Sequence, residues 1–236
     1  MIQVHVKVSR FNPEKGDTQP HFDEFTVEAD PTEKVLDLLH RIKWEQDGTL
    51  AFRRSCAHGI CGSCAMKING RNMLACESLI SNFKDPTHIT VEPLRSLPVI
   101  KDLVVDMDDF FKKYEVIKPY LINKTPPPTK ERYQSVEDRE LIDESTKCIQ
   151  CGACTTSCPS NWKNPQFLGP ASLLKAFRYT FDSRDEGAAE RLMVVDNNDG
   201  VWRCHTIFNC VEACPKDINL TWHISELKKK LVSREY

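Results

Sequence analysis

The first hundred residues alternate hydrophobic and polar side chains as a small, half-buried sheet does. Residues 2–8 place an apolar side chain at every second position, and residues 25–29 repeat the pattern. Asn69-Gly70 separates two short apolar runs, and both residues tolerate positive φ. This pattern predicts an N-terminal hairpin, a second hairpin that turns at Asn69-Gly70, and a last short strand at residues 89–91.

One helix interrupts the predicted strands. Asp30 is a suitable N-cap, Pro31 suits a first helical turn, and Glu33 completes a capping box. The residues that follow carry an apolar stripe at helical spacing, formed by Val35, Leu36, Leu38, Leu39 and Ile42. We therefore predict a helix that opens at residues 30–33 and buries this stripe.

The spacing of apolar residues becomes helical in the second half of the chain. Residues 104–111 carry a helical pattern, and the proline-rich residues 125–129 fit neither a helix nor a sheet. Two further helices are predicted by Leu173, Leu174, Phe177 and Phe181 and by Trp222, Ile224, Leu227 and Leu231. We predict an α+β chain with one domain at residues 1–105 and a helical domain at residues 106–236.

Composition and charge exclude several classes of protein. The chain has 236 residues, 40% of them hydrophobic and 28% charged, which suits two globular domains. A formal net charge of -2 gives no reason to expect a nucleic-acid partner. No stretch approaches the roughly 18 to 20 consecutive apolar residues of a membrane-spanning helix. Because the strand pattern begins at Ile2, we expect neither a signal nor a transit peptide and place the chain in a reducing cytoplasm.

Eleven cysteines fall into three groups. Closely spaced cysteines in a reducing compartment favour metal ligands over disulfides. The first group has the plant-type spacing of a two-iron cluster and consists of Cys56, Cys61, Cys64 and Cys76. Gly59 and Gly62 lie within its loop, where a tight bend brings backbone N–H groups towards sulfur. The first group therefore predicts a two-iron centre.

A zinc site and a Rieske centre are the other metal sites that the first group could form. A zinc site of four cysteines usually joins two C-x2-C pairs, whereas only Cys61 and Cys64 form such a pair here. A Rieske centre needs a second histidine at the position that Cys64 occupies. We therefore favour an iron-sulfur cluster over zinc and regard His58 as a loop residue.

The other two groups contain seven cysteines. Cys148, Cys151, Cys154 and Cys158, followed by Pro159, form the complete bacterial run for iron-sulfur clusters. Cys204, Cys210 and Cys214 repeat this run with Ile207 at the position of its second cysteine. In two-cluster proteins the fourth cysteine of each run ligates the other cluster. The ligand sets predicted in this way are Cys148, Cys151, Cys154 and Cys214 for a four-iron cluster, and Cys158, Cys204 and Cys210 for a three-iron cluster.

One alternative for the last site is a labile four-iron cluster with a non-protein ligand at the corner beside Ile207.

Elsewhere the chain lacks G-x-G-x-x-G and phosphate-binding loops, so no nucleotide site is expected. No set of nucleophile, base and orienting residue is present, so no catalytic residue is predicted. Redox equivalents must then come from another protein.

The cysteine groups resemble those of a known family when they are taken with Phe52-Arg53-Arg54-Ser55-Cys56, Arg203-Cys204-His205 and Ala213-Cys214-Pro215-Lys216. The family is that of the iron-sulfur subunits of succinate dehydrogenase and fumarate reductase, and the resemblance covers essentially the whole length. It implies a β-grasp ferredoxin domain followed by a helical ferredoxin domain. It also implies a flavoprotein partner that carries FAD, and a membrane anchor that often binds haem b and helps to form a quinone site. The chain would then be peripheral, held by anchor subunits at the cytoplasmic face of the cell membrane.

The resemblance also implies residues beside the quinone, namely Pro159, Ser160, Trp162, His205 and Ile207. Relatives that use ubiquinone often have a second tryptophan where this chain has Lys163, so menaquinone is an alternative. Packing against the anchor subunit is the other interpretation of Trp162, and exposure to solvent is the other interpretation of Lys163.

The function that these features favour is electron transfer from FAD to quinone in a membrane-bound succinate dehydrogenase. A quinol:fumarate reductase would use the same clusters in the opposite direction. A free ferredoxin-like carrier and a zinc-containing interaction protein are alternatives from other classes.

Overall fold

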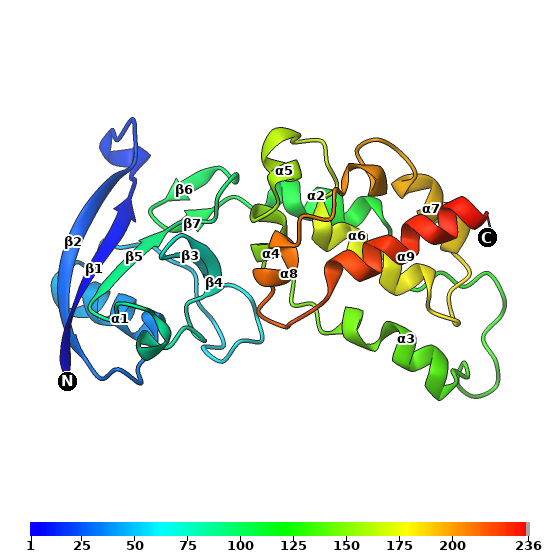
Figure 1. Cartoon of the computed structure of the whole chain (residues 1–236), viewed down its shortest axis with the longest axis horizontal. Helices are drawn as coiled ribbons and strands as arrows, with labels where there is room; N and C mark the ends of the chain where they lie inside the picture. Colours follow the sequence, from blue (N-terminus) through cyan, green and yellow to red (C-terminus); the bar gives the residue numbers. More distant parts are fainter. Residues whose placement is uncertain (235–236) are drawn as a thin grey trace. The chain divides into compact units, whose positions relative to one another are not determined.

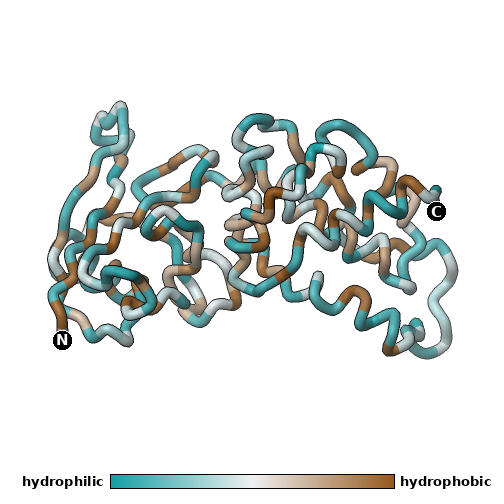
Figure 2. The backbone as a smooth tube through the Cα atoms, in the orientation of Figure 1, coloured by the Kyte–Doolittle hydropathy of each residue, from teal (hydrophilic) through white to brown (hydrophobic). Residues whose placement is uncertain are grey.

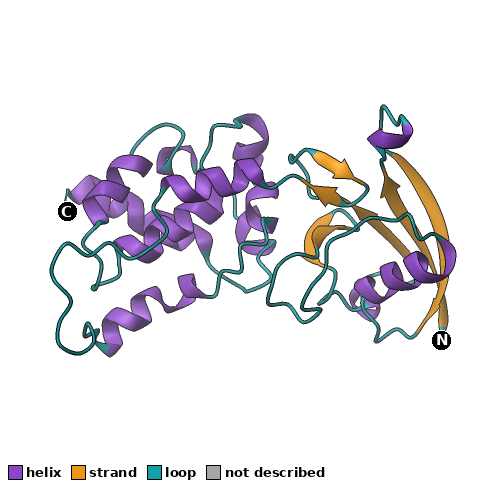
Figure 3. Cartoon of the chain, turned by 180° about the vertical axis from the view of Figure 1, so that it is seen from behind, coloured by secondary structure: helices purple, strands orange, loops and turns teal. Residues whose placement is uncertain are grey.

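The chain folds into two compact units in the computed structural model, which describes residues 1–234 (Figure 1). Unit 1 contains Met1–Met107 together with Ile149–Thr156, and unit 2 contains Asp108–Cys148 and the chain from Ser157 onward. The strands belong to unit 1, and the longer helices of the second half belong to unit 2 (Figure 3). This arrangement confirms the predicted α+β class.

A five-stranded mixed sheet forms the centre of unit 1. Its strands lie in the order β2-β1-β5-β3-β4, with β1 and β5 parallel and the other neighbours antiparallel, which is a β-grasp arrangement. The strands are β1 (Ile2–Arg10), β2 (His21–Ala29), β3 (Ala65–Ile68), β4 (Arg71–Leu74) and β5 (His88–Glu92). The predicted alternation is confirmed in β1, where Val4, Val6 and Val8 are fully buried. The predicted turn is confirmed as well, because Asn69 and Gly70 both have positive φ between β3 and β4.

The predicted helix of unit 1 is present but begins later than expected. Helix α1 spans Val35–Arg41 and continues as a π turn at Ile42–Gln46, and all five residues of the predicted stripe are buried. The prediction that Asp30 caps this helix is wrong. The Asp30 carboxylate accepts hydrogen bonds from the N–H and hydroxyl of Thr32, and the Glu33 carbonyl accepts one from the N–H of Ile80. Because the carbonyls of Pro31 and Glu33 accept from the N–H groups of Ser81 and Ile80 and not from residues four positions later, residues 30–33 form a turn.

The helix predicted at residues 104–111 also begins later. β7 (Val104–Val105) pairs with β6 (Val99–Lys101) in a small separate sheet, and α2 spans Asp108–Val116. β-Branched valines suit a paired strand, so this local pairing replaces the first turn of the predicted helix. No helix or strand forms at residues 125–129, as the prolines predict.

Unit 2 is built mainly around α6 (Gly169–Thr180), which packs against α3, α7 and α9. The other helices of the second half are α3 (Val136–Thr146), α4 (Ala153–Thr156, within unit 1), α5 (Pro159–Lys163), α7 (Ala188–Val195), α8 (Asn209–Glu212) and α9 (Leu220–Ser233), with a 3-10 turn at Val201–Arg203. Both helices predicted from apolar spacing are confirmed as α6 and α9. Phe177 of α6 stacks on Phe181 at 4.4 Å and meets Trp222 of α9 edge to face at 5.6 Å.

The apolar positions can be followed along the backbone of each unit in Figure 2. Within residues 1–234, none of the helices has both the length and the apolar composition needed to cross a lipid bilayer.

Candidate metal centres

Two cysteines of the first group are placed by the β3–β4 hairpin of unit 1. Cys64 directly precedes β3, and Cys76 follows β4 by two residues. Ala65 lies opposite Leu74 in the ladder, and the N–H of Ala75 donates to the Cys64 carbonyl at 3.1 Å. The antiparallel pairing therefore brings two cysteines that are twelve positions apart to the same end of the hairpin.

Backbone N–H groups of the loop point at the sulfur atoms of this group. The Sγ of Cys56 accepts from the N–H of Ile60 and of Cys61 at 3.3 Å and from that of His58 at 3.5 Å. The N–H of Gly59 donates to the Sγ of Cys76 at 3.2 Å. These donors stabilise a thiolate, and they lower the pKa of Cys56 to about 6. Because iron binds the thiolate form, the loop fits a cluster ligand at Cys56.

Cys64 lies in a different environment from Cys56. It is buried, and the burial raises the pKa of its thiol to about 12. Charges on Cys76 and Cys61 also raise it, so the three thiols are electrostatic neighbours. A buried thiolate at Cys64 needs a positive centre beside it, and bound iron would provide one. The donor set of the first group thus fits a two-iron cluster, although its four ligands remain a prediction.

Two other loop residues show why the chain bends here. The exposed ring of His58 lies with Nδ1 2.5 Å from the Cys56 carbonyl oxygen, so the side chain is engaged with the loop backbone. Gly62 has a φ of +72°, and a Cβ at this position would lie 2.8 Å from the Cβ of Cys151. Both the left-handed backbone and the close approach require glycine at position 62.

The bacterial run and the gapped run contribute a pair of thiols in unit 2. Cys148 follows α3, and Cys214 follows α8, sixty-six positions later. Burial raises the pKa of Cys214, and the charge of Cys148 raises it further. The two thiols are therefore electrostatic neighbours, as expected if the last cysteine of the gapped run joins the first run. In unit 1, Cys151 packs against the core and Cys154 is buried on α4.

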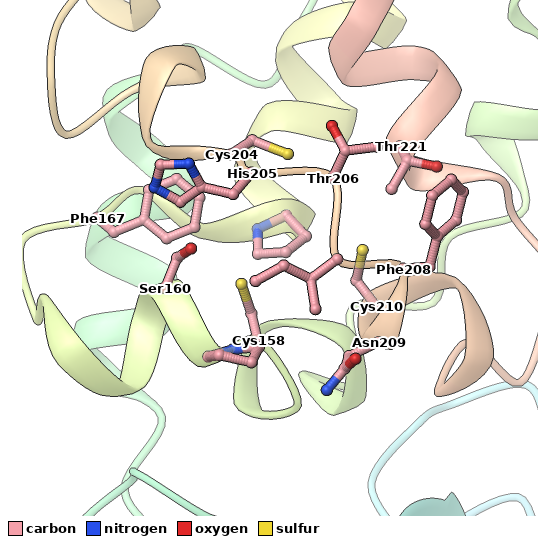
Figure 4. A pocket seen from close by; sticks show the side chains of 13 residues that line it. Cys158, Ser160, Phe167, Cys204, His205, Thr206, Phe208, Asn209, Cys210 and Thr221 are labelled. Carbon is pink, nitrogen blue, oxygen red and sulfur yellow. The ribbon is translucent and has the colours of Figure 1, made fainter.

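A pocket in unit 2 collects the other three cysteines (Figure 4). Cys158 is the N-cap of α5, Cys204 follows the 3-10 turn at Val201–Arg203, and Cys210 lies on α8. The pocket has a volume of about 310 Å³, counting space open to solvent. Burial raises the pKa of Cys210 to about 12, and charges on Cys158 and Cys204 raise it too. Three thiols from separate elements therefore face one space.

Ile207 lines the same pocket and is 46% exposed. An isoleucine side chain cannot ligate iron, so the pocket offers three thiols and an apolar fourth position. This donor set fits a three-iron cluster better than a complete cube. Within residues 1–234, no group of three or more His, Cys, Asp or Glu side chains is arranged to hold a single metal ion.

Four of the five residues predicted beside a quinone line this pocket, namely Pro159, Ser160, His205 and Ile207. Trp162 does not line it and lies half-buried on α5, where Lys163 is exposed. Sequence reasoning missed the rest of the wall, which includes Phe167, Pro170 and Thr221. Phe167 precedes α6, Pro170 lies in its first turn and Thr221 lies in the first turn of α9, all outside the cysteine motifs, so helix packing brings them to the pocket.

Two protein families match separate parts of the chain. A family described as "2Fe-2S iron-sulfur cluster binding domain" matches residues 5–112, and one described as "4Fe-4S dicluster domain" matches residues 140–215.

Curated relatives match nearly the whole length. The chain is 44% identical over 229 residues to the "Succinate dehydrogenase iron-sulfur subunit" of Paracoccus denitrificans, covering 96% of this chain and 87% of the relative. It is 47% identical over 226 residues to the "Succinate dehydrogenase [ubiquinone] iron-sulfur subunit 1, mitochondrial" of Oryza sativa subsp. japonica, covering 94% and 80%. Among solved structures, a chain of the "Mycobacterium smegmatis Sdh1 complex in the apo form" superimposes with a TM-score of 0.86 at 30% identity, covering 99% of this chain and 97% of that one.

Proposed function

The chain belongs to the family of succinate dehydrogenase iron-sulfur subunits, and from this membership we propose that it carries electrons from a flavoprotein to quinone. It is a subunit of an oxidoreductase, and the dicarboxylate chemistry belongs to a partner chain. The observation that carries the proposal is the pocket of Cys158, Cys204 and Cys210, with Ile207 where a fourth ligand would stand. A chain that held only complete clusters, or zinc, is expected to have a fourth ligand in place of Ile207.

The proposed ligands divide into three sets. Cys56, Cys61, Cys64 and Cys76 hold the two-iron cluster, Cys148, Cys151, Cys154 and Cys214 the four-iron cluster, and Cys158, Cys204 and Cys210 the three-iron cluster. When bound, these clusters exchange one electron each, so the electron pair released from succinate at the flavin is passed on singly.

The protein contributes the environment of each set. The N–H groups of His58, Ile60 and Cys61 stabilise negative charge at Cys56. Burial keeps water from Cys64 and Cys210, which favours thiolates that are neutralised by iron over free ones. Because Ile207 cannot ligate iron, one corner of the third cluster has no protein ligand.

The quinone is proposed to bind beside the third set, at Pro159, Ser160, His205 and Ile207, with Trp162 as a further contact. Support for this comes from the pocket, which the first four of these residues line together with the three thiols. The exposed position of Lys163 leaves both ubiquinone and menaquinone compatible with the pocket.

The same proposal includes the partners and the location. A flavoprotein with FAD would supply electrons, and a membrane anchor, with haem b in some complexes, would hold the chain at the cytoplasmic face of the cell membrane. We propose succinate oxidation as the direction, because the relatives at 44% and 47% identity are named succinate dehydrogenase. Fumarate reduction by the same clusters is the alternative.

Metal analysis and spectroscopy of the purified complex test the proposal. We expect about nine iron atoms per chain, from the two-, four- and three-iron clusters, and little zinc. Low-temperature EPR should show a three-iron signal in the oxidised complex and a two-iron signal in the reduced one. Succinate oxidation with quinone should exceed fumarate reduction with quinol. Zinc in place of iron, or oxidised complex without a three-iron signal, would refute the assignment.

A further inference from the structure

A single carboxylate bonds the last turn of α3 to the first residues of α9. Glu144 of α3 accepts a hydrogen bond at Oε1 from the N–H of Asn219, over 3.0 Å. Its other oxygen, Oε2, lies 3.6 Å from Nε2 of His223, whose side chain is completely buried. Glu144 therefore joins two elements of unit 2 that are seventy-five positions apart in the chain.

The sequence of α9 explains why this carboxylate comes from another helix. Asn219 is the N-cap of α9, and its side-chain Oδ1 accepts from the N–H of Trp222 at 3.1 Å. In a capping box, a glutamate or glutamine at the position of Trp222 would bond the N–H of the cap in return. Tryptophan has no acceptor, so Glu144 supplies one. A carboxylate at this place also interacts favourably with the positive end of the helix dipole.

His223 completes the junction as a neutral ring. Its Nδ1 lies 2.8 Å from the carbonyl oxygen of Asn219, and because a carbonyl only accepts, Nδ1 carries the proton. Burial lowers the pKa of His223, so Nε2 has no proton at neutral pH. Within residues 1–234, no group hydrogen-bonds to Nε2 of His223. Glu144 therefore holds α9 through Asn219, and a donor at the position of Oε2 would find an acceptor on His223.

Short hydrogen-bonded turns connect this junction to two cysteines. The N–H of Lys147 donates to the Glu144 carbonyl at 3.2 Å, directly before Cys148. The N–H of Asp217 donates to the Cys214 carbonyl at 3.2 Å, two residues before the N-cap of α9. Cys148 is thus four residues from the junction and Cys214 is five. Since a residue spans at most about 3.6 Å of chain, neither cysteine moves far while the junction is closed.

We propose that Glu144 is a positioning residue that holds Cys148 and Cys214 at the separation that their shared four-iron cluster requires. The proposal rests on the cluster assignment given under the proposed function. Glu144 does not touch iron. It fixes two backbone segments in advance, so that less conformational entropy is lost when the thiolates bind the cluster. Without its bond to Asn219, the two segments separate more readily and the four-iron cluster becomes labile.

The rate at which the purified complex loses each cluster to an iron chelator tests the proposal. Glu144→Ala removes the acceptor of the Asn219 N–H. We expect the four-iron EPR signal of the reduced complex to decay at least tenfold faster than in wild type, which corresponds to about 1.4 kcal/mol. The three-iron and two-iron signals should decay at their wild-type rates. Iron should fall from about nine to about five atoms per chain.

Two further variants separate the hydrogen bond from other effects. Glu144→Gln keeps an acceptor for the Asn219 N–H, and its amide N–H can donate to Nε2 of His223, so the four-iron signal should last as long as in wild type. Glu140→Ala is the matched control, because it removes a carboxylate at an exposed position of the same helix. All three signals should decay in this variant as they do in wild type.

A four-iron signal that decays at the wild-type rate in Glu144→Ala would overturn the proposal. Failure of Glu144→Gln to retain the cluster would do the same. So would a Glu144→Ala complex that fails to assemble or loses the four-iron and three-iron signals at equal rates, because the thiols of Cys158, Cys204 and Cys210 lie in the same unit and report its unfolding. If the wild-type complex holds no four-iron cluster, the cluster assignment itself fails, and iron analysis of wild type separates that outcome from failure at Glu144.

Discussion

The carboxylate of Asp102 holds the backbone of Ala51, whose N–H donates to Oδ2 at 2.8 Å. Asp102 is 1% exposed, and its other oxygen accepts from the Nε of Arg10 at 3.1 Å and from the N–H of Phe11 at 3.0 Å. The chain enters the cysteine loop directly after Ala51. One buried carboxylate therefore ties the start of the first metal loop to the end of β1.

Asp102→Asn should destabilise unit 1 by about 1–3 kcal/mol, because the new amide NH2 must face either the N–H of Ala51 or the Arg10 guanidinium, although Arg10 keeps Asp47 and Asp23 as partners. Asp23→Asn is the matched control, since Asp23 pairs with the same guanidinium but is 42% exposed in its side chain. Its expected cost is about 0–1 kcal/mol. Thermal denaturation of the two complexes, followed by the two-iron EPR signal, measures the difference. Equal thermal midpoints would contradict the anchoring role of Asp102.

Gly62→Ala should disturb the first metal loop. The new methyl group would overlap the Cβ of Cys151 at 2.8 Å and would sit on a left-handed backbone. Together the overlap and the backbone strain are expected to cost about 2–5 kcal/mol. Gly70→Ala has a similar φ of +84° but no atom within 4 Å, so strain alone should cost about 1–2 kcal/mol. The thermal midpoint and iron content of each complex give the comparison, and equal losses would rule out the close contact as the cause.

The proposed crossing of ligands between the two cysteine runs predicts that replacing one cysteine removes one cluster and leaves the other. Cys214→Ser should remove the four-iron EPR signal and leave the three-iron signal, because Cys214 is proposed to ligate the four-iron cluster with Cys148, whose charge raises the pKa of Cys214. Cys158→Ser should have the opposite effect, because Cys158 shares a pocket with Cys204 and Cys210. If each variant lost the cluster of its own run, the proposed crossing of ligands would be wrong.

Ile207→Cys should supply the missing ligand of the third set. We expect the three-iron EPR signal to disappear and the iron content to rise from about nine to about ten atoms per chain. Quinone reduction should slow several-fold, because a complete cube has a different potential. Ile207→Val keeps the position apolar and should retain the three-iron signal. An unchanged cluster type in the cysteine variant would remove the support for the vacant corner.

The Asp182 carboxylate should stabilise the folded chain at neutral pH and lose this effect in acid. Its carboxylate is fully buried beside Arg178 and Arg184, and hydrogen bonds from Arg184 and Arg178 hold its pKa well below the ordinary value of 3.8 despite the opposing effect of burial. A lowered folded-state pKa means that the stabilisation is complete above pH 3.8 and is lost as the pH falls through the lower, folded-state value.

Asp182→Asn measures this contribution. The difference in thermal midpoint between wild type and variant should be constant from pH 8 to pH 5 and should shrink in acid below about pH 4, where the unfolded carboxyl titrates. Circular dichroism of both proteins across this range gives the two curves. A difference that already shrank between pH 8 and pH 5 would assign the effect to another group.

Patterns that act locally predicted the fold well. Alternation at Val4, Val6 and Val8 placed β1 because one face of a strand is buried and the other is not, and Asn69-Gly70 placed a turn that requires positive φ. The cap at Asp30 failed for a reason that lies outside the local sequence. The N–H of Ile80, fifty positions after Asp30, donates a hydrogen bond to the Glu33 carbonyl, so the first predicted turn of the helix could not form.

The metal centres also have a part that the local sequence predicts and a part that it does not. The spacing of the cysteines predicted three sets of ligands, and the electrostatic coupling of Cys148 with Cys214 is consistent with those sets. Phe167 and Thr221 of the pocket wall carry no motif. Their importance arises from helix packing within unit 2, which spacing along the chain does not encode.

The segment Ile149–Thr156 belongs to unit 1, although the residues before and after it belong to unit 2. Synthesis must therefore pass residue 156 before every packing segment of unit 1 is present, long after its last strand has been made. A gene fragment that stopped at residue 107 would yield a sheet without one of its packing segments. A graft of the complete unit 1 would therefore need two separate stretches of the gene, residues 1–107 and residues 149–156.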